Sequence, residues 1–183
     1  VTTSFALTAT SKNNLNFRDL IIGGMNITTS SNMTIERCLL FSTSATTQAF
    51  VFANNSNVNY NTTIKQSIIT GTVAGIEYKY VNSGSPWTAG LYISDCFITG
   101  LNAVYINNIG TFNQYPAGSV TVYNSVLMGY VPYYYNQTYA TASSTGNNIK
   151  VNNSLLYATG TYVFQCASIG FEENYNRIYG VNT

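Results

Sequence analysis

The stretch SVTVYNSVLMG at residues 119–129 decides the fold of this chain. Apolar residues alternate with other residues on both sides of the polar pair Asn124 and Ser125, which predicts two short strands joined by a sharp bend. The same pattern occurs one fixed interval earlier, as GLYISDCFITG (90–100), and the same interval later, as NIKVNNSLLYA (148–158). One pattern at a fixed interval is typical of a repeat protein.

The interval holds through five copies without an insertion or a deletion. The position of Ser125 defines an anchor, which in successive copies is Cys38, Ser67, Cys96, Ser125 and Ser154. A β-branched apolar residue stands three positions before each anchor and a polar residue one position before it. Ile or Leu follows two positions after the anchor, and Ser, Gly or Ala follows four after it. A shorter copy, NFRDLIIGG (16–24), places Leu20 at the anchor.

Each copy has room for three short strands and their turns, and it cannot bury its inner face alone. Neighbouring copies are therefore expected to stack at a strand spacing of about 4.8 Å. The pattern in VTVYNSVLMG (120–129) resembles the coil of the right-handed parallel β-helix, the pectin-lyase-like superfamily. The resemblance implies an all-β solenoid with five 29-residue coils and a shorter first coil. The alternative is a β-sandwich with a donated strand.

Three segments are predicted along the chain. Residues 1–14 form an extended N-terminal strand or linker, residues 15–165 form the β-helix, and residues 166–183 form a C-terminal segment or cap. Because the sequence begins with Val and shows no signal-type apolar segment, a mature, processed chain or an excised piece is expected.

The composition indicates which partners and which location are expected. Charged residues make up 7% of the chain, the net charge is +1 and there is no His, so neither nucleic acid nor an anionic membrane is expected as a partner. No apolar run of about 20 residues occurs, so no membrane insertion is expected. The surface must rely on 24 Asn, 24 Thr, 17 Ser and 16 Tyr. This composition favours an extracellular cell surface or a virion surface, and it resembles the glycosylated surface proteins of extremophilic archaea.

Six sequons are candidates for N-glycosylation, at Asn26, Asn32, Asn54, Asn61, Asn136 and Asn152. Their number is close to what chance gives in so Asn- and Thr-rich a chain, so the count alone does not indicate glycans. Glycans nevertheless remain candidate partners or modifications of an extracellular surface.

No catalytic, cofactor or metal site is predicted. The resemblance implies clustered Asp with Lys or Arg in polysaccharide-cleaving relatives, and this chain has only six acidic residues. Glu36 is expected beside Lys65 one coil away, as an ion pair, and Asn124 is expected to stack on Asn153. The adjacent Glu172 and Glu173 are the remaining candidates for a metal or acid role, which we do not favour.

The cysteines are not expected to form a disulfide within the β-helix. Cys38 and Cys96 share a column but lie two coils apart, a separation of about 9.5 Å that exceeds the roughly 7 Å Cα limit for a disulfide. Cys166 is left over, and either a buried thiol or a cross-link between subunits is open.

Two surface features point to assembly. The residue after each anchor should point outward, which predicts an apolar outer stripe of Leu39, Ile68, Phe97, Val126 and Leu155. Another subunit or strand docks there, a terminal segment (1–10 or 174–183) or the protruding turns of the same chain cover it, or the inward–outward alternation shifts at the bend. Five tyrosines are expected in the protruding part of the fourth coil, as a sugar platform, an assembly contact or ordinary packing: Tyr130, Tyr133, Tyr134, Tyr135 and Tyr139.

The N-terminal stretch VTTSFALTAT (1–10) is the candidate donor strand, with Val1, Phe5, Leu7 and Ala9 on one face. The sequence therefore favours a non-enzymatic structural subunit of an extracellular filament or appendage, a homopolymer assembled head-to-tail through terminal strands or β-helix ends. The alternative is a phage or viral spike or adhesin domain that binds, and in one version cleaves, surface glycans.

Overall fold

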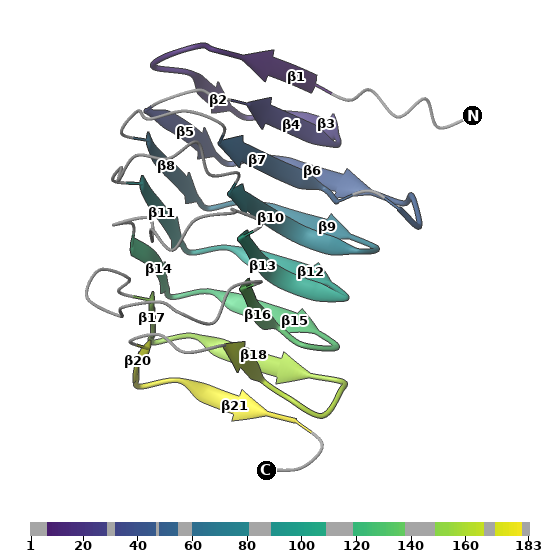
Figure 1. Cartoon of the computed structure of the whole chain (residues 1–183), viewed down its shortest axis with the longest axis vertical. Coiled ribbons are helices and arrows are strands. Elements are labelled where there is room, and N and C mark those ends of the chain that lie inside the picture. The colour runs from purple at the N-terminus through teal and green to yellow at the C-terminus, as the bar shows by residue number, and fades with distance from the viewer. Residues whose placement is uncertain are drawn as a thin grey trace.

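A computed structural model describes residues 7–28, 32–46, 48–54, 60–80, 89–108, 119–137, 149–166 and 171–180. The elements in these ranges are strands, and they stack into a parallel β-solenoid with the N-terminal strands at one end and the C-terminal strands at the other (Figure 1). None of the described residues forms a helix long and apolar enough to cross a bilayer. Residues 1–6, which include Val1 and Phe5 of the candidate donor strand, lie outside these ranges.

The strands form three parallel sheets of seven strands each. The first sheet contains, in spatial order, β1 (Leu7–Thr10), β4 (Met25–Thr28), β7 (Phe50–Asn54), β10 (Ala74–Tyr80), β13 (Asn102–Asn108), β16 (Tyr133–Gln137) and β19 (Phe164–Cys166). The second contains β2 (Asn16–Arg18), β5 (Met33–Glu36), β8 (Tyr60–Lys65), β11 (Ala89–Ser94), β14 (Ser119–Tyr123), β17 (Ile149–Asn152) and β20 (Phe171–Asn174). The third contains β3 (Ile21–Gly23), β6 (Leu39–Ser42), β9 (Ile68–Gly71), β12 (Phe97–Gly100), β15 (Val126–Gly129), β18 (Leu155–Ala158) and β21 (Arg177–Tyr179).

Residues that are one repeat apart in the sequence pair with each other on neighbouring strands. Leu39 pairs with Ile68, and the same step continues through Phe97 and Val126 to Leu155. The all-β parallel solenoid predicted from the repeat is thereby confirmed, and the β-sandwich alternative is wrong.

The solenoid extends beyond the predicted range of 15–165 at both ends. At the N-terminal end β1 pairs with β4 in the first sheet. At the C-terminal end β20 and β21 pair with β17 and β18. The five regular coils are therefore flanked by a shorter coil on each side.

The core consists of columns of equivalent side chains, one from each coil. In the second sheet Ile35, Ile64, Ile93, Val122 and Val151 stack in register, and each is at most 1% exposed. These residues are the β-branched positions three before each anchor. Burying each one removes it from water and stacks it on a residue of the same shape, which favours β-branched side chains.

The bend between the second and third sheets has one conformation in all seven coils. The residue before the anchor adopts a positive φ between 49° and 58°, the left-handed region. These residues are Asp19, Arg37, Gln66, Asp95, Asn124, Asn153 and Tyr175. Asn and Asp tolerate this region better than other non-glycine residues, which accounts for Asp95, Asn124 and Asn153 but not for Arg37 and Gln66.

The anchor residues form a hydrogen-bonded ladder beneath the bends. Ser125 Oγ accepts a bond from the Cys96 N–H at 3.2 Å and donates to the Tyr123 carbonyl at 2.8 Å. Ser154 Oγ accepts from the Ser125 N–H at 3.1 Å in the same way. The anchors of the five regular coils are at most 5% exposed, so a small side chain with a hydrogen-bond donor is favoured there.

A small residue four positions after the anchor is required by close packing of the backbone. A Cβ atom on Gly71 would collide with the carbonyl oxygen of Ala74, and one on Gly129 would collide with that of Gly100. The constant spacing of the sequence pattern thus reflects the turn into the first sheet.

The left-handed bend predicts an unusual response to substitution at Gln66, where φ is 51°. The free energy of unfolding of Gln66→Gly is expected to be about 1 kcal/mol higher than that of Gln66→Ala, because only glycine avoids the steric cost of this region. Urea denaturation of the two variants measures the difference. Equal stabilities would show that the bend is not held in the left-handed region.

Candidate functional site

The predicted outer stripe is a continuous column on the outer face of the third sheet. Ile68 is 51% exposed and Phe97 is 41% exposed, whereas Leu39, Val126 and Leu155 are half-buried. Their register places them side by side along the solenoid axis. No charged side chain interrupts this column from the first of these residues to the last.

The column is longer than the sequence predicted. Ile21, which is 77% exposed, continues it at the N-terminal end by pairing with Leu39. Arg177 ends it at the C-terminal end by pairing with Leu155. Ile21 follows Leu20, the anchor of the short first copy, so the sequence could have added it to the stripe, whereas Arg177 belongs to a last coil that was not predicted.

A second column runs parallel to the first on the same face. It contains Phe41, Thr70, Thr99, Met128, Tyr157 and Tyr179. Met128, Tyr157 and Tyr179 are 38%, 44% and 51% exposed. Thr99 donates a hydrogen bond to Thr70 at 3.0 Å, so even its polar members are paired within the sheet. We call the two columns together the apolar outer face.

The described parts of the two terminal segments do not cover this face. Leu7 and Ala9 belong to β1, which pairs with β4 in the first sheet, and both side chains pack against the core of their own chain. The C-terminal strand β21 is an edge strand of the third sheet itself. The apolar outer face is thus open over the described residues, and β1 is used within its own solenoid.

The bend column borders the apolar outer face with polar and charged groups. Arg37 donates to both carboxylate oxygens of Asp19, from Nε at 2.7 Å and from Nη2 at 2.8 Å. These hydrogen bonds from Arg37 hold the pKa of Asp19 below its ordinary value and raise the pKa of Arg37. Both side chains are about half exposed, so the pair adds little to stability.

Glu36 lies at the centre of the densest group of charges. It is 7% exposed, and its carboxylate lies 2.6 Å from Arg37 Nη1, 3.0 Å from Arg18 Nε and 3.4 Å from Lys65 Nζ. The predicted contact of Glu36 with Lys65 is confirmed. The expectation of a simple surface pair is wrong, because three cations from three coils enclose this carboxylate.

Stacked amides continue the bend column toward the C-terminus. Asn124 Nδ2 donates to Asp95 Oδ1 at 3.3 Å, and Asn153 Nδ2 donates to Asn124 Oδ1. The predicted stacking of Asn124 on Asn153 is confirmed. In such a ladder each amide forms a hydrogen bond with the side chain of the neighbouring coil, in addition to its contact with solvent.

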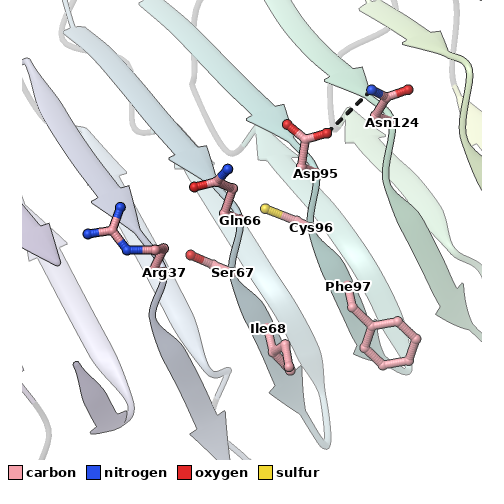
Figure 2. A pocket seen from close by; sticks show the side chains of 8 residues that line it. All are labelled: Arg37, Gln66, Ser67, Ile68, Asp95, Cys96, Phe97 and Asn124. Atoms are coloured by element: carbon pink, nitrogen blue, oxygen red, sulfur yellow. Dashed lines mark hydrogen bonds between the residues drawn. The ribbon is translucent and has the colours of Figure 1, made fainter. Parts of the chain in front are cut away.

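A shallow groove of about 660 Å³ lies where the bend column meets the apolar outer face (Figure 2). Its lining residues are Arg37, Gln66, Ser67, Ile68, Asp95, Cys96, Phe97 and Asn124. Arg37 forms ion pairs with two carboxylates, and Asp95 accepts a hydrogen bond from the Asn124 amide. Both side chains therefore already take part in structural contacts. Among its described lining residues the groove has neither a carboxylate pair nor a histidine.

Cys96 contributes a thiol to the groove. Burial raises the pKa of its thiol to about 11, and the Sγ atom lies 3.1 Å from the Ser94 carbonyl. The thiol is therefore protonated and inert at neutral pH. Cys38 and Cys96 are both buried and free, with Ser67 between them in the anchor column. The thiol of Cys166 lies outside the described side chains.

The tyrosines do not form one protruding cluster. Tyr133 is fully buried in the inner face of β16, and Tyr134 stacks on Tyr105 with ring centroids 5.2 Å apart on the outer face of the first sheet. Tyr130 is 52% exposed, the side chain of Tyr135 is not described, and Tyr139 lies outside the described residues. The expectation that these tyrosines lie in a protruding part of the coil is therefore wrong for Tyr133–Tyr135, which belong to a strand.

Glu172 and Glu173 point to opposite faces of β20. Glu172 lies on the outer face, 2.9 Å from Lys150 Nζ. Glu173 pairs with Val151 in the inner column of the second sheet. They do not converge, and among the described residues no three acidic or cysteine side chains are grouped as a metal site would require.

The described sequons differ in access. Asn26, Asn32 and Asn61 are exposed, although Asn32 Nδ2 donates to Asn14 Oδ1 at 3.3 Å. Asn152 is half-buried, and Ser154 of its sequon is 5% exposed and bonded in the anchor ladder. The side chains of Asn54 and Asn136 lie outside the part of the chain whose side chains are described.

The last coil was not predicted, although a signal for it exists. In NYNRIYG (174–180), Asn176 takes the anchor position and donates to the Val151 carbonyl at 2.6 Å. Its Oδ1 accepts from the Ser154 N–H at 2.8 Å, as a serine hydroxyl does elsewhere. Ile178 and Gly180 stand two and four positions after it. A search that allowed the interval to shorten would have found this copy.

No family model, no curated protein and no solved structure matches this chain. Its function is consequently inferred from the geometry of the chain itself.

The raised pKa of Cys96 predicts a specific pH dependence of stability. The folded chain binds its thiol proton more tightly than the unfolded chain, whose cysteine keeps its ordinary pKa. The free energy of unfolding should therefore fall as the pH rises from about 9 to about 11. Urea denaturation between pH 8 and 11 in a reducing buffer measures the slope. Cys96→Ser is the control, and an identical slope in this variant would contradict the assignment.

Proposed function

We propose that this chain is a non-enzymatic structural subunit of an extracellular cell-surface filament or appendage, and that copies associate laterally through the apolar outer face. The observation that carries the proposal is the uninterrupted apolar column from Ile21 to Leu155, in which Ile21, Ile68 and Phe97 are exposed. A continuous apolar column on the outside of a solenoid favours a contact surface.

The occupant that fits this face best is a second copy of the chain. The side chains of the face repeat at the strand spacing, and a second copy presents the same repeat, so the two can interdigitate. The described parts of the terminal segments are engaged elsewhere, which leaves the face without an intramolecular cover there. The donated-strand route has less support, because β1 completes its own first sheet.

The face is smaller than the contact that a stable isolated pair usually buries. Seven strands of about four residues cover an area of roughly 34 Å by 13 Å, or about 440 Å². A stable pair usually buries about 800 Å² on each partner. A staggered arrangement in which each copy contacts two neighbours gains from multivalency and remains open, which generates a filament.

The alternative function is a trimeric spike or adhesin domain, in which the same face forms the trimer seam. In a parallel threefold seam three copies of Arg177 would meet at one level, and like charges at close distance are unfavourable. A staggered contact avoids this arrangement, which is why we favour the filament. The right-handed pectin-lyase-like relationship, the extracellular location and the archaeal origin belong to the same proposal, and they rest on the coil pattern and the composition.

The lateral contact is tested by the double substitution Ile68→Ser and Phe97→Ser. Each side chain contributes about 1 kcal/mol when half of its surface is buried, so association should weaken about 30-fold. The matched control is Tyr92→Ser, since Tyr92 is 43% exposed on the outer face of the second sheet.

Sedimentation velocity and electron microscopy of native material are the measurements. Filaments or large oligomers of the parent chain and of Tyr92→Ser, together with smaller species of the double variant, support the proposal. A parent chain that stays monomeric at every accessible concentration overturns it, and discrete trimers favour the spike alternative.

Glycan attachment is a separate expectation of the extracellular proposal. Asn26, Asn32 and Asn61 are expected to carry glycans, whereas Asn152 should not, because Ser154 of its sequon is buried and hydrogen-bonded in the bend. Glycopeptide mapping of material from the native source measures occupancy at each site. Occupancy at Asn152 with empty sites at the other three would contradict this expectation.

A further inference from the structure

Over the described residues, the two ends of the solenoid leave opposite edges of the same three sheets unpaired. The N-terminal face carries the edge strands β1, β2 and β3, and the C-terminal face carries β19, β20 and β21 (Figure 1). All the sheets are parallel, so the N-terminal face of one copy can be placed on the C-terminal face of another with every sheet continued. Such a contact is heterologous and open, and repeating it builds a fibre.

The inner columns of the first and third sheets would continue through this junction without a break. In the first sheet the column runs from Leu7 at one end to Phe164 at the other. In the third sheet it runs from Ile22 to Ile178. All four side chains remain at least partly exposed to solvent at the ends, and they are apolar.

The second sheet is the exception. Its inner column begins at Phe17 and continues with five buried β-branched residues, the last of which is Val151. The column then ends in Glu173. Glu173 is exposed, and none of the ion pairs among the described residues includes it. A carboxylate therefore stands at a position that carries an apolar side chain in every other coil.

We propose that the two end faces are complementary docking surfaces for a second copy of this chain, and that Glu173 keeps them from stacking. Stacking would place the Glu173 carboxylate on Phe17 of the next copy, in an apolar column without a cation, and the desolvation cost of such a charge is large. An inward-pointing charge on an edge strand is a known means of preventing strands from adding to a sheet edge. The end-face contact is independent of the lateral contact proposed above.

The decisive variant is Glu173→Val, which completes the apolar column. End-to-end association is expected to strengthen about 100-fold or more relative to the parent chain. The matched control is Glu172→Val on the same strand, which removes the same charge from the outer face. Both substitutions are made in the background of Ile68→Ser and Phe97→Ser, so that lateral association does not contribute.

Sedimentation velocity and electron microscopy distinguish the outcomes, and a thermal melt by circular dichroism verifies that each variant is folded. Single-width rods of Glu173→Val with an axial repeat of about 34 Å, alongside dispersed Glu172→Val, support the proposal. Dispersed particles for both variants overturn it, because the end faces are then not complementary. Rods for both variants also overturn it, since loss of any charge would then suffice. Adding Phe17→Glu to Glu173→Val places a charge on the opposite face and should abolish the rods.

Discussion

The interaction on which the rest of this structure depends is the hydrogen bonding of each strand to the equivalent strand one coil away. A single coil has no partner for its strand N–H and carbonyl groups and cannot bury its own inner face. Neighbouring coils supply both, and they do so only if every coil adopts the same bend. The left-handed residue before each anchor and the hydrogen-bonded anchor ladder keep the bend identical from Asp19 to Tyr175.

Because the coils stack in register, the residues at one position of the repeat form a column along the whole molecule. The β-branched position before the bend builds the inner column of the second sheet, and the position after the anchor builds the outer stripe. The bend position builds the polar border in which Arg37 binds Asp19 and Asn124 binds Asp95. The same rule makes the two ends special, since a column that stops exposes whatever residue occupies its last position.

Much of this arrangement was predictable from the sequence because the segment from the second sheet to the third has a constant length. Leu39, Ile68 and Phe97 follow one another at the regular interval, so their alignment was predictable. The first sheet is different, because Met25 stacks on Phe50 after a shorter interval and Tyr133 stacks on Phe164 after a longer one. The turns that lead into this sheet vary in length, which is why Tyr133–Tyr135 were assigned to a protruding turn instead of to β16.

The sequence by itself determined the parallel solenoid, its regular coils, the inward anchors and the outward apolar stripe, because each of these follows from a local pattern repeated at a constant interval. Only the tertiary structure decided what happens where that interval changes. It placed Leu7 and Ala9 in the first sheet of their own chain, enclosed Glu36 with cations from three coils, and set Glu173 at the end of an apolar column. These contacts join residues that the register of the sheets brings together. A periodic sequence pattern predicts that register only where the repeat keeps its constant length.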